Sequence, residues 1–302
     1  LGAVRRCSRR KPTPTSLFPH FEVVLKMKNL SLAVAPDIAA FLASWLQNDL
    51  LQGEAEATFN SYYGAFRRNF SDRMRSYYAE QIREIEALVI AAPNMRVLEV
   101  GCGLGTETLW LALKGARVTA LDVRGDRIAG ARARLAVLQD QLDRPLNVDF
   151  SMQSMLDLGE AEPFDAIWME QAFHHLEPRH EVVAKTARLL KPGGHLVISE
   201  ANALNPLIQA ELLVRRGWPR VETMAGPGGK DILYGVERIT TALALTRAFS
   251  NQGIDRQSLR YFRMFPSAGI FDALGGVERA LAWRCLAPIL THFNWVGRKA
   301  AA

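Results

Sequence analysis

The sequence has few cysteines and none in a metal-binding arrangement. Its three cysteines, Cys7, Cys102 and Cys285, lie far apart in the chain of 302 residues and show no metal-ligand spacing. No segment reaches the roughly 18 uninterrupted apolar residues of a membrane span, and the best candidate, 280–290, is broken by Arg284. Internal repeats and low-complexity tracts are absent as well. We therefore expect a cytoplasmic protein with reduced thiols, no metal site and no transmembrane segment.

The chain also lacks a strong charge of one sign outside its first residues. The sequence pI of about 9.4 hints at a nucleic-acid partner. Residues 1–26, however, hold six basic side chains against Glu22 alone, so the remaining residues carry 31 basic and 30 acidic side chains. Because the chain after residue 26 is nearly neutral, its composition does not indicate a basic surface for a polyanion. No nucleic acid is therefore expected as a partner.

Composition divides the chain into three parts. Residues 1–26 are rich in arginine and contain no methionine, and Met27 then opens a segment that looks like an ordinary start. We interpret 1–26 as a disordered upstream extension, with a transit peptide as the alternative. Residues 27–92 predict a helical N-terminal cap, because their apolar residues recur at helical spacing. Residues 93–302 are expected to form the main domain, with a helical insert at about 203–257.

The most informative stretch is 97–106, which reads VLEVGCGLGT. Its apolar first half predicts a strand that is buried on both faces of a parallel sheet. Gly101, Gly103 and Gly105 then allow a tight turn and a close approach of the backbone to a ligand. A helix is expected from Thr106, and a strand, a glycine turn and a helix N-terminus form a nucleotide-binding element. The dinucleotide fingerprint requires glycine where Thr106 stands, so a nicotinamide-dependent dehydrogenase is the disfavoured alternative.

Strands and helices alternate after this element. Further strands are expected at 117–121, 146–150, 164–169 and 195–199, with helices at 126–138 and 179–190. This alternation predicts an α/β fold with a Rossmann-like, doubly wound, mostly parallel sheet. Strand-like segments at 258–265 and 292–299 are expected to complete it with an antiparallel last strand.

Asp122 stands at the carboxyl end of the second expected strand. It follows Gly101 by 21 residues, which is about the spacing of an acidic residue that accepts hydrogen bonds from ribose hydroxyls. The alternative is an ordinary surface aspartate after a strand.

Four segments in order resemble a known family. They are the ExGxGxG pattern at 99–105, Asp122, FDAIWMEQAFHH at 164–175 and LLKPGGHLVISE at 189–200. This set resembles the class I S-adenosylmethionine-dependent methyltransferases of the small-molecule, type 11 kind, over roughly 73–202. The resemblance implies S-adenosyl-L-methionine as cofactor and a methyltransferase that acts on O, N or C of a small or lipid-like molecule. A non-catalytic, cofactor-binding scaffold and a protein or RNA methyltransferase are the alternative functions.

The resemblance also implies a set of cofactor contacts. In the family the acidic residue of the glycine motif orients the aminoacyl end, and the residue after the ribose-binding aspartate packs against adenine. The family's aspartate after the third strand falls on Ser154 here, and Gln153 is the alternative contact to adenine. The predicted cofactor-binding residues are Glu99, Gly101, Cys102, Gly103, Gly105, Thr106, Asp122, Val123, Ser154, Met155 and Glu170.

Candidates for the chemistry follow the fourth expected strand. Methyl transfer from a sulfonium depends mainly on positioning, and a base is needed only if the acceptor must lose a proton. Histidine titrates near pH 6.5 and can serve as that base, although a His-His pair is also a common structural feature of the family. The predicted catalytic residues are His174, His175 and Glu170, and Gln171, Glu200 and Asn202 are further candidates on the acceptor side.

An aromatic group precedes the glycine turn in the N-terminal cap. Tyr62, Tyr63 and Phe66 lie close together in the sequence. They are interpreted as core residues, or as part of a lid over the acceptor pocket.

Overall fold

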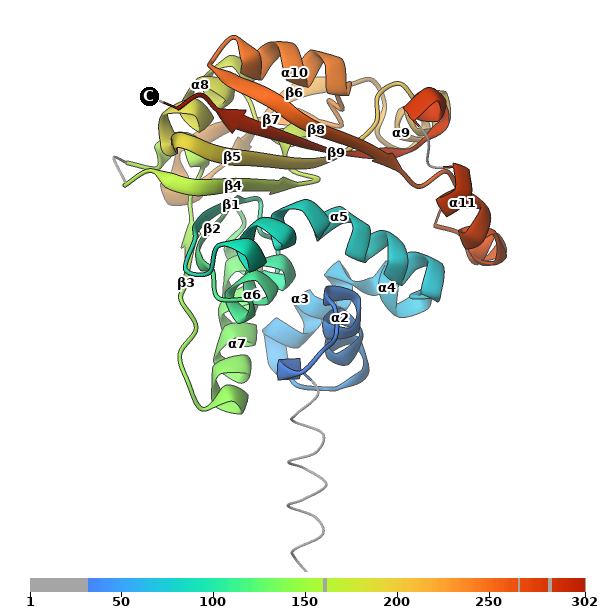
Figure 1. Cartoon of the computed structure of the whole chain (residues 1–302). Helices are drawn as coiled ribbons and strands as arrows, with labels where there is room; N and C mark the ends of the chain where they lie inside the picture. The colour runs from blue at the N-terminus through green and yellow to red at the C-terminus, as the bar shows by residue number, and fades with distance from the viewer. Residues whose placement is uncertain (1–31, 160–161, 266, 282–283, 302) are drawn as a thin grey trace, which may run out of the picture.

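A seven-stranded sheet forms the centre of the protein in the computed structural model (Figure 1), which describes residues 32–159, 162–265, 267–281 and 284–301. The expected upstream extension at 1–26 lies outside these residues. The strands run in the order β3-β2-β1-β4-β5-β9-β8. Their bounds are β1 (Arg96–Val100), β2 (Arg117–Asp122), β3 (Val148–Met152), β4 (Phe164–Glu170), β5 (Leu190–Ala201), β8 (Ile254–Phe262) and β9 (His292–Lys299).

The pairing of the strands confirms the predicted fold class. Strands β1 to β5 run parallel to one another, whereas β9 is antiparallel to both β5 and β8. The predicted KPGG loop lies inside β5, where the register with β4 shifts between Phe164 and Ala166. The carboxyl ends of the five parallel strands therefore share one edge, at which folds of this kind bind ligands.

Helices cover both faces of the sheet (Figure 1). Residues of α2, α5, α6 and α7 share one hydrophobic core with the sheet, and residues of α8 and α10 share the other. The helices are α2 (Ile38–Gln47), α3 (Gly53–Tyr62), α4 (Gly64–Arg68), α5 (Asp72–Ala91), α6 (Thr106–Leu113), α7 (Gly125–Leu142), α8 (Arg179–Leu189), α9 (Pro206–Arg216), α10 (Ala242–Ser250) and α11 (Gly275–Leu281). Short 3-10 turns add η1 (Met155–Asp157), η2 (Phe173–His175), η3 (Pro227–Gly229), η4 (Gly269–Leu274) and η5 (Arg284–Ile289).

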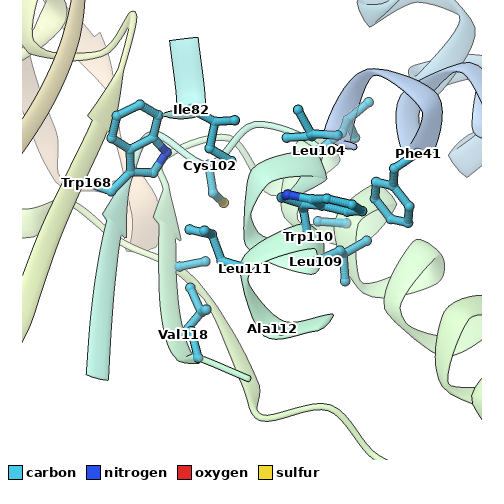
Figure 2. Packing of buried hydrophobic residues seen from close by; sticks show 14 of the residues in the cluster. Phe41, Ile82, Cys102, Leu104, Leu109, Trp110, Leu111, Ala112, Val118 and Trp168 are labelled. Carbon is cyan, nitrogen blue, oxygen red and sulfur yellow. The ribbon is translucent and has the colours of Figure 1, made fainter. Parts of the chain in front are cut away.

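Side chains that alternate along a strand contribute to both hydrophobic cores. In β4, Ala166 and Trp168 belong to the first core, and Ile167 and Met169 to the second, because successive side chains point to opposite faces. Figure 2 shows the first core, in which the Trp110 ring of α6 packs against Phe41 of α2 at 5.6 Å between centroids. This packing fixes the N-terminal helices against the helix that follows the glycine turn.

The described part of the segment expected to form a helical N-terminal cap, 27–92, contains α2 to α5. Asp37 caps α2 by accepting from the Ala40 amide at 2.7 Å, and Ser71 caps α5 by accepting from the Met74 amide at 3.4 Å. None of the described helices is long and apolar enough to cross a bilayer.

The expectation of a helical insert at about 203–257 is wrong in its centre. After α9 the chain forms an antiparallel hairpin of β6 (Arg220–Ala225) and β7 (Asp231–Val236), and β8 already begins at Ile254. The hairpin turns at Gly226, whose amide donates to the Lys230 carbonyl at 2.9 Å. A Cβ on Gly226 would lie 2.7 Å from that carbonyl oxygen, so glycine is required where the two strands meet.

Candidate functional site

A cavity of about 490 Å³ opens where β1, β2, β3 and β4 end. Its size lies within the roughly 300–1,000 Å³ range of small-molecule sites. Seven of the predicted cofactor-binding and catalytic residues line it together: Gly101, Asp122, Val123, Ser154, Met155, Glu170 and His175. We call this space the first cavity.

Asp122 is held rigidly at the end of β2. One carboxylate oxygen accepts from the Gly103 amide at 3.0 Å, and the other accepts from the Arg124 amide at 2.9 Å. Arg127 lies 3.6 Å from the carboxylate as well, and Asp122 is only 5% exposed. The side chain thus ties the glycine turn to β2 and keeps its carboxylate on the wall of the cavity.

The glycine turn approaches its surroundings too closely for side chains. Gly101 has φ +81°, and a Cβ there would lie 2.8 Å from the Cβ of Ala172. Gly103 has φ +53°, and a Cβ there would lie 2.4 Å from the hydroxyl oxygen of Tyr62. Both positions combine left-handed backbone with close contact, so they require glycine.

Five of the predicted cofactor-binding residues do not occur among the described lining residues of the cavity: Glu99, Cys102, Gly103, Gly105 and Thr106. Glu99 accepts from the Thr108 hydroxyl, and burial followed by the nearby Glu107 charge raises the pKa of its carboxyl. Thr106 is fully buried. The side chains of Glu99 and Thr106 therefore serve the scaffold, and of the turn itself Gly101 is the residue among the described cavity lining.

Arg134 of α7 supports the glycine turn on the side away from the cavity. The sequence analysis did not predict this role. Its guanidinium donates to the Leu104 carbonyl and to the Thr106 hydroxyl, both at 2.7 Å. The same hydroxyl lies 2.5 Å from the Tyr63 hydroxyl. Arg134 is fully buried, and burial lowers its pKa. A signal existed in the sequence, since Arg134 stands three residues after the buried Ala131 on the inner face of α7.

The residues expected to contact adenine also lie on the wall of the first cavity. Ser154 and Met155 follow β3 and line it, as does Gln153. The Ser154 hydroxyl already accepts from the Leu156 amide at 3.2 Å, and the Gln153 amide donates to Ser151 at 2.9 Å. Both side chains are therefore fixed in place at this wall.

The two histidines after β4 have different surroundings. His174 is 5% exposed, its Nδ1 lies 2.7 Å from Glu200, and it is absent from the described lining of the first cavity. Burial opposes its charge, but the Glu200 carboxylate outweighs burial and raises its pKa. His175 lines the cavity and donates from Nδ1 to the Gly235 carbonyl at 2.8 Å. Burial, followed by the His174 charge, lowers the pKa of His175 to about 4.

Glu200 and Asn202, the candidates from β5, both have structural partners. The second Glu200 carboxylate oxygen accepts from the His174 amide at 3.2 Å. Asn202 donates to the carbonyls of Ala287 and Leu290 at 2.7 and 2.8 Å. Both side chains are fully buried, so they hold the end of β5 in place.

A second cavity of about 290 Å³ adjoins the first. Tyr62, Glu170 and Gln171 line both cavities and so form the wall between them. Of the aromatic group in the N-terminal cap, Tyr63 and Phe66 also line the second cavity. The structure thus brings these rings from α3 and α4 next to the carboxyl end of β4.

The hairpin β6–β7 contributes residues to the first cavity that were not predicted from the sequence. Met224, Ile232 and Tyr234 line the first cavity, and the Tyr234 ring stacks on His175 at 4.5 Å between centroids. A Cβ on Gly235 would lie 2.5 Å from the His174 carbonyl oxygen, which shows how closely β7 packs on η2. The available signal was the short run of Ile232, Leu233 and Tyr234, which follows the glycines at 226, 228 and 229.

Comparisons with known proteins agree with this geometry. A family model described as a methyltransferase domain matches residues 98–198. A ubiquinone biosynthesis O-methyltransferase of Xanthomonas campestris is 36% identical over 115 residues, which cover 37% of this chain and 46% of that protein. Methyltransferase GfsG of Streptomyces halstedii is 31% identical over 182 residues, which cover 58% and 62%. The chain spans about half the length of the curated relatives it matches.

Solved structures share the fold. Magnesium protoporphyrin IX methyltransferase from Synechocystis, with bound S-adenosylhomocysteine, aligns with a TM-score of 0.52 at 14% identity, covering 82% of this chain and 100% of that one. An S-adenosylmethionine-dependent methyltransferase from Methanosarcina mazei aligns with a TM-score of 0.50 at 16% identity, covering 69% and 94%. The matched segment, the strand order and the glycine turn agree: residues 98–198 match a methyltransferase domain, and the sheet has the fold of the class I S-adenosylmethionine-dependent methyltransferases.

Proposed function

We propose that this protein transfers the methyl group of S-adenosyl-L-methionine to a small molecule, with the methyl donor bound in the first cavity. The observation that carries this proposal is the position of Asp122. It offers a buried carboxylate on the cavity wall, at the end of β2 and beside the glycine turn. That arrangement suits the two adjacent hydroxyls of a ribose, which donate well to a carboxylate.

The residues of the first cavity fit the other parts of the donor. Val123 and Met155 supply apolar surface for adenine, and Ser154 and Gln153 lie beside them for its polar edge. Glycine at 101 lets the aminoacyl part approach the backbone, because a Cβ would fill that space. When bound, the donor supplies a methyl group on a positively charged sulfur.

The chain's own contribution is orientation and exclusion of water. The Asp122 carboxylate fixes the ribose, and the hairpin residues Ile232 and Tyr234 cover the cavity from the insert. Positioning of this kind lowers the barrier because the reacting atoms no longer have to find each other in solution. The sequence-based expectations of a cytoplasmic location and of an acceptor that is not a nucleic acid are retained within this proposal.

Calorimetric titration with S-adenosyl-L-methionine tests the proposed site. Asp122→Ala should weaken binding by about 1–3 kcal/mol, because the ribose donors lose their charged acceptor. Asp126→Ala is the matched control, since Asp126 stands four residues later at the start of α7, forms an exposed ion pair with Arg124 and is not among the described lining residues of the first cavity. Equal affinities of the Asp122→Ala variant and the wild type would refute the ribose assignment.

A further inference from the structure

We propose that the second cavity is the acceptor site, and that it takes a hydroxylated aromatic ring with an anionic substituent opposite the hydroxyl, with Glu170 receiving the hydroxyl proton. This inference rests on the proposed methyl transfer, because it assigns the other substrate of the same reaction.

The first support is the shared wall. Tyr62, Glu170 and Gln171 face both cavities, so a molecule in the second cavity meets the donor's cavity at the end of β4. An acceptor must reach the methyl group within about 3–3.5 Å, and only an adjoining space allows this.

The second support is Gln171. It has φ +45°, which a residue other than glycine rarely adopts. Its side-chain amide nitrogen is buried and has no hydrogen-bond partner within the described structure. Strained backbone and an unused buried donor together mark a position that is held for a ligand. Because Gln171 lines both cavities, its amide is placed to donate to the oxygen of an acceptor.

The third support is the aromatic lining. Along α5, Met74, Tyr77, Tyr78 and Gln81 line the second cavity at the spacing of one helix face. Phe66 closes it from α4. Flat rings offer a flat molecule offset-stacked and edge-to-face contacts, which stabilise aromatic pairs beyond simple burial. A volume of about 290 Å³ suits a compound with a single ring.

Charge gives the ring its orientation. Glu170 accepts from Gln81 at one end, and the Arg263 guanidinium lies 4.2 Å from the Tyr77 ring centroid. Tyr77 and Gln81 are four residues apart on α5, which is about 6 Å along the helix axis. Glu170 and Arg263, which both line the second cavity, thus contact α5 about one helical turn apart, and a ring with substituents at opposite positions can span such a spacing. A hydroxyl at Glu170 therefore leaves the opposite substituent facing Arg263, where an anion is favoured.

The proton balance of the step is complete. The hydroxyl oxygen forms a bond to the methyl carbon as the carbon–sulfur bond breaks, and the sulfur keeps that electron pair. The hydroxyl proton passes to the Glu170 carboxylate. The charged and titratable groups that face Glu170 are Glu99 of β1, Glu107 of α6, Glu200 of β5, Tyr62 of α3, and Tyr77 and Tyr78 of α5. Burial and the neighbouring carboxylates raise the pKa of Glu170, which strengthens it as a base.

A third space, rich in arginine, is the rival acceptor site. It is lined by Arg127, Arg216 and Arg220 beside the hairpin. Each of these guanidinium groups already has a carboxylate close by: Arg127 lies near Asp122, Arg216 near Glu237 and Arg220 near Glu222. Glu170 and Gln171 are not among its described lining residues, so it lacks the unused donor, and burial lowers the pKa of its histidine, His175, to about 4, which makes that side chain a weak base.

Three matched rings test the proposal: phenol, 4-hydroxybenzoate and 4-hydroxybenzylamine. We would first titrate the protein with S-adenosylhomocysteine and then measure binding of each ring to the loaded protein by calorimetry. The carboxylate ring should bind about 10- to 100-fold more tightly than the amine, and Arg263→Gln should remove that difference. Arg260→Gln on β8 is the control, because Arg260 pairs with Glu80 outside the cavity. Arg220→Gln tests the rival space and should leave ring binding unchanged.

Kinetics test the role of Glu170. Glu170→Gln should lower kcat about 100-fold or more and remove the rise of the rate with pH, while ring affinity stays within about threefold. Absence of S-adenosylhomocysteine binding would refute the proposed function itself. Cofactor binding without binding of any ring would overturn only the acceptor site, as would tightest binding of the amine or a loss of ring binding in Arg220→Gln. An unchanged pH profile in Glu170→Gln would overturn the assignment of the base.

Discussion

Arg134 offers the sharpest test of how the glycine turn is held. Its guanidinium donates to the Leu104 carbonyl and the Thr106 hydroxyl at 2.7 Å, and it lies 4.5 Å from the Trp45 ring centroid. A hydrogen bond from a charged donor contributes about 1.5–3 kcal/mol, and a desolvated cation–π contact about 2 kcal/mol. The cost of burying the charge, visible in the lowered pKa of Arg134, offsets part of this sum.

Two substitutions of Arg134 separate these contributions. Arg134→Ala removes the bonds and leaves a void, so we expect a loss of about 3–5 kcal/mol in the free energy of unfolding. Arg134→Met fills most of the space and removes the buried charge, so its loss should be smaller, about 1–2 kcal/mol. Urea unfolding followed by circular dichroism measures both values.

A control on the same helix makes the Arg134 result specific. Arg132 is exposed and donates to the Phe150 carbonyl at 2.5 Å, so Arg132→Ala should cost about 1 kcal/mol or less. If Arg134→Ala lost no more than Arg132→Ala, the guanidinium would not be holding the turn and this reasoning would fail.

Three further substitutions test single contacts, each measured by urea unfolding. Burial lowers the pKa of His175 from 6.5 to about 4. The folded state therefore loses no stability through His175 above pH 6.5, and it loses up to about 3 kcal/mol of unfolding free energy as the pH falls to 4. His175→Gln should remove this loss of stability at acid pH, and an unchanged pH dependence would contradict the prediction. Tyr63→Phe should cost about 1 kcal/mol through the lost bond to Thr106, and no loss would mean that the bond contributes nothing. Gly105→Ala should cost about 1–3 kcal/mol, because φ is +70° and the new Cβ would lie 2.7 Å from the Phe150 ring; a neutral result would show that the turn can relax.

The centre of the fold could be predicted because its signals are local. The apolar run before Gly101 and the similar runs at 117–121 and 164–169 each specify a buried strand, and short connections then leave few sheet topologies. The structure confirms the parallel order and the antiparallel β9. Asp122 could be placed at the sheet edge for the same reason, since the end of a strand is a position that the sequence marks.

The hairpin β6–β7 could not be predicted with the same rules. Most of its residues are exposed or half-buried, so no continuous apolar pattern marks β6. Its register depends on packing against η2, where Gly235 meets the His174 carbonyl. The sequence of either segment alone does not indicate a contact with a segment about 60 residues away.

Side-chain direction limited the prediction of the site. The sequence places Thr106 next to the glycine turn but does not tell which way its hydroxyl points, and it points toward Tyr63 and Arg134. Arg134 was missed for a related reason: a charged residue on the inner stripe of a helix is usually attributed to the solvent face. Only three-dimensional packing shows that its partners are a carbonyl, a hydroxyl and aromatic rings.

Product analysis of the complete reaction tests the central claim most directly. The protein would be incubated with S-adenosyl-L-methionine and a pool of small metabolites that includes hydroxylated aromatic acids, and mass spectrometry would follow both substrates. We predict that S-adenosylhomocysteine forms together with a small molecule that has gained one methyl group. Binding of S-adenosyl-L-methionine without formation of S-adenosylhomocysteine would contradict it and would favour a non-catalytic, cofactor-binding scaffold.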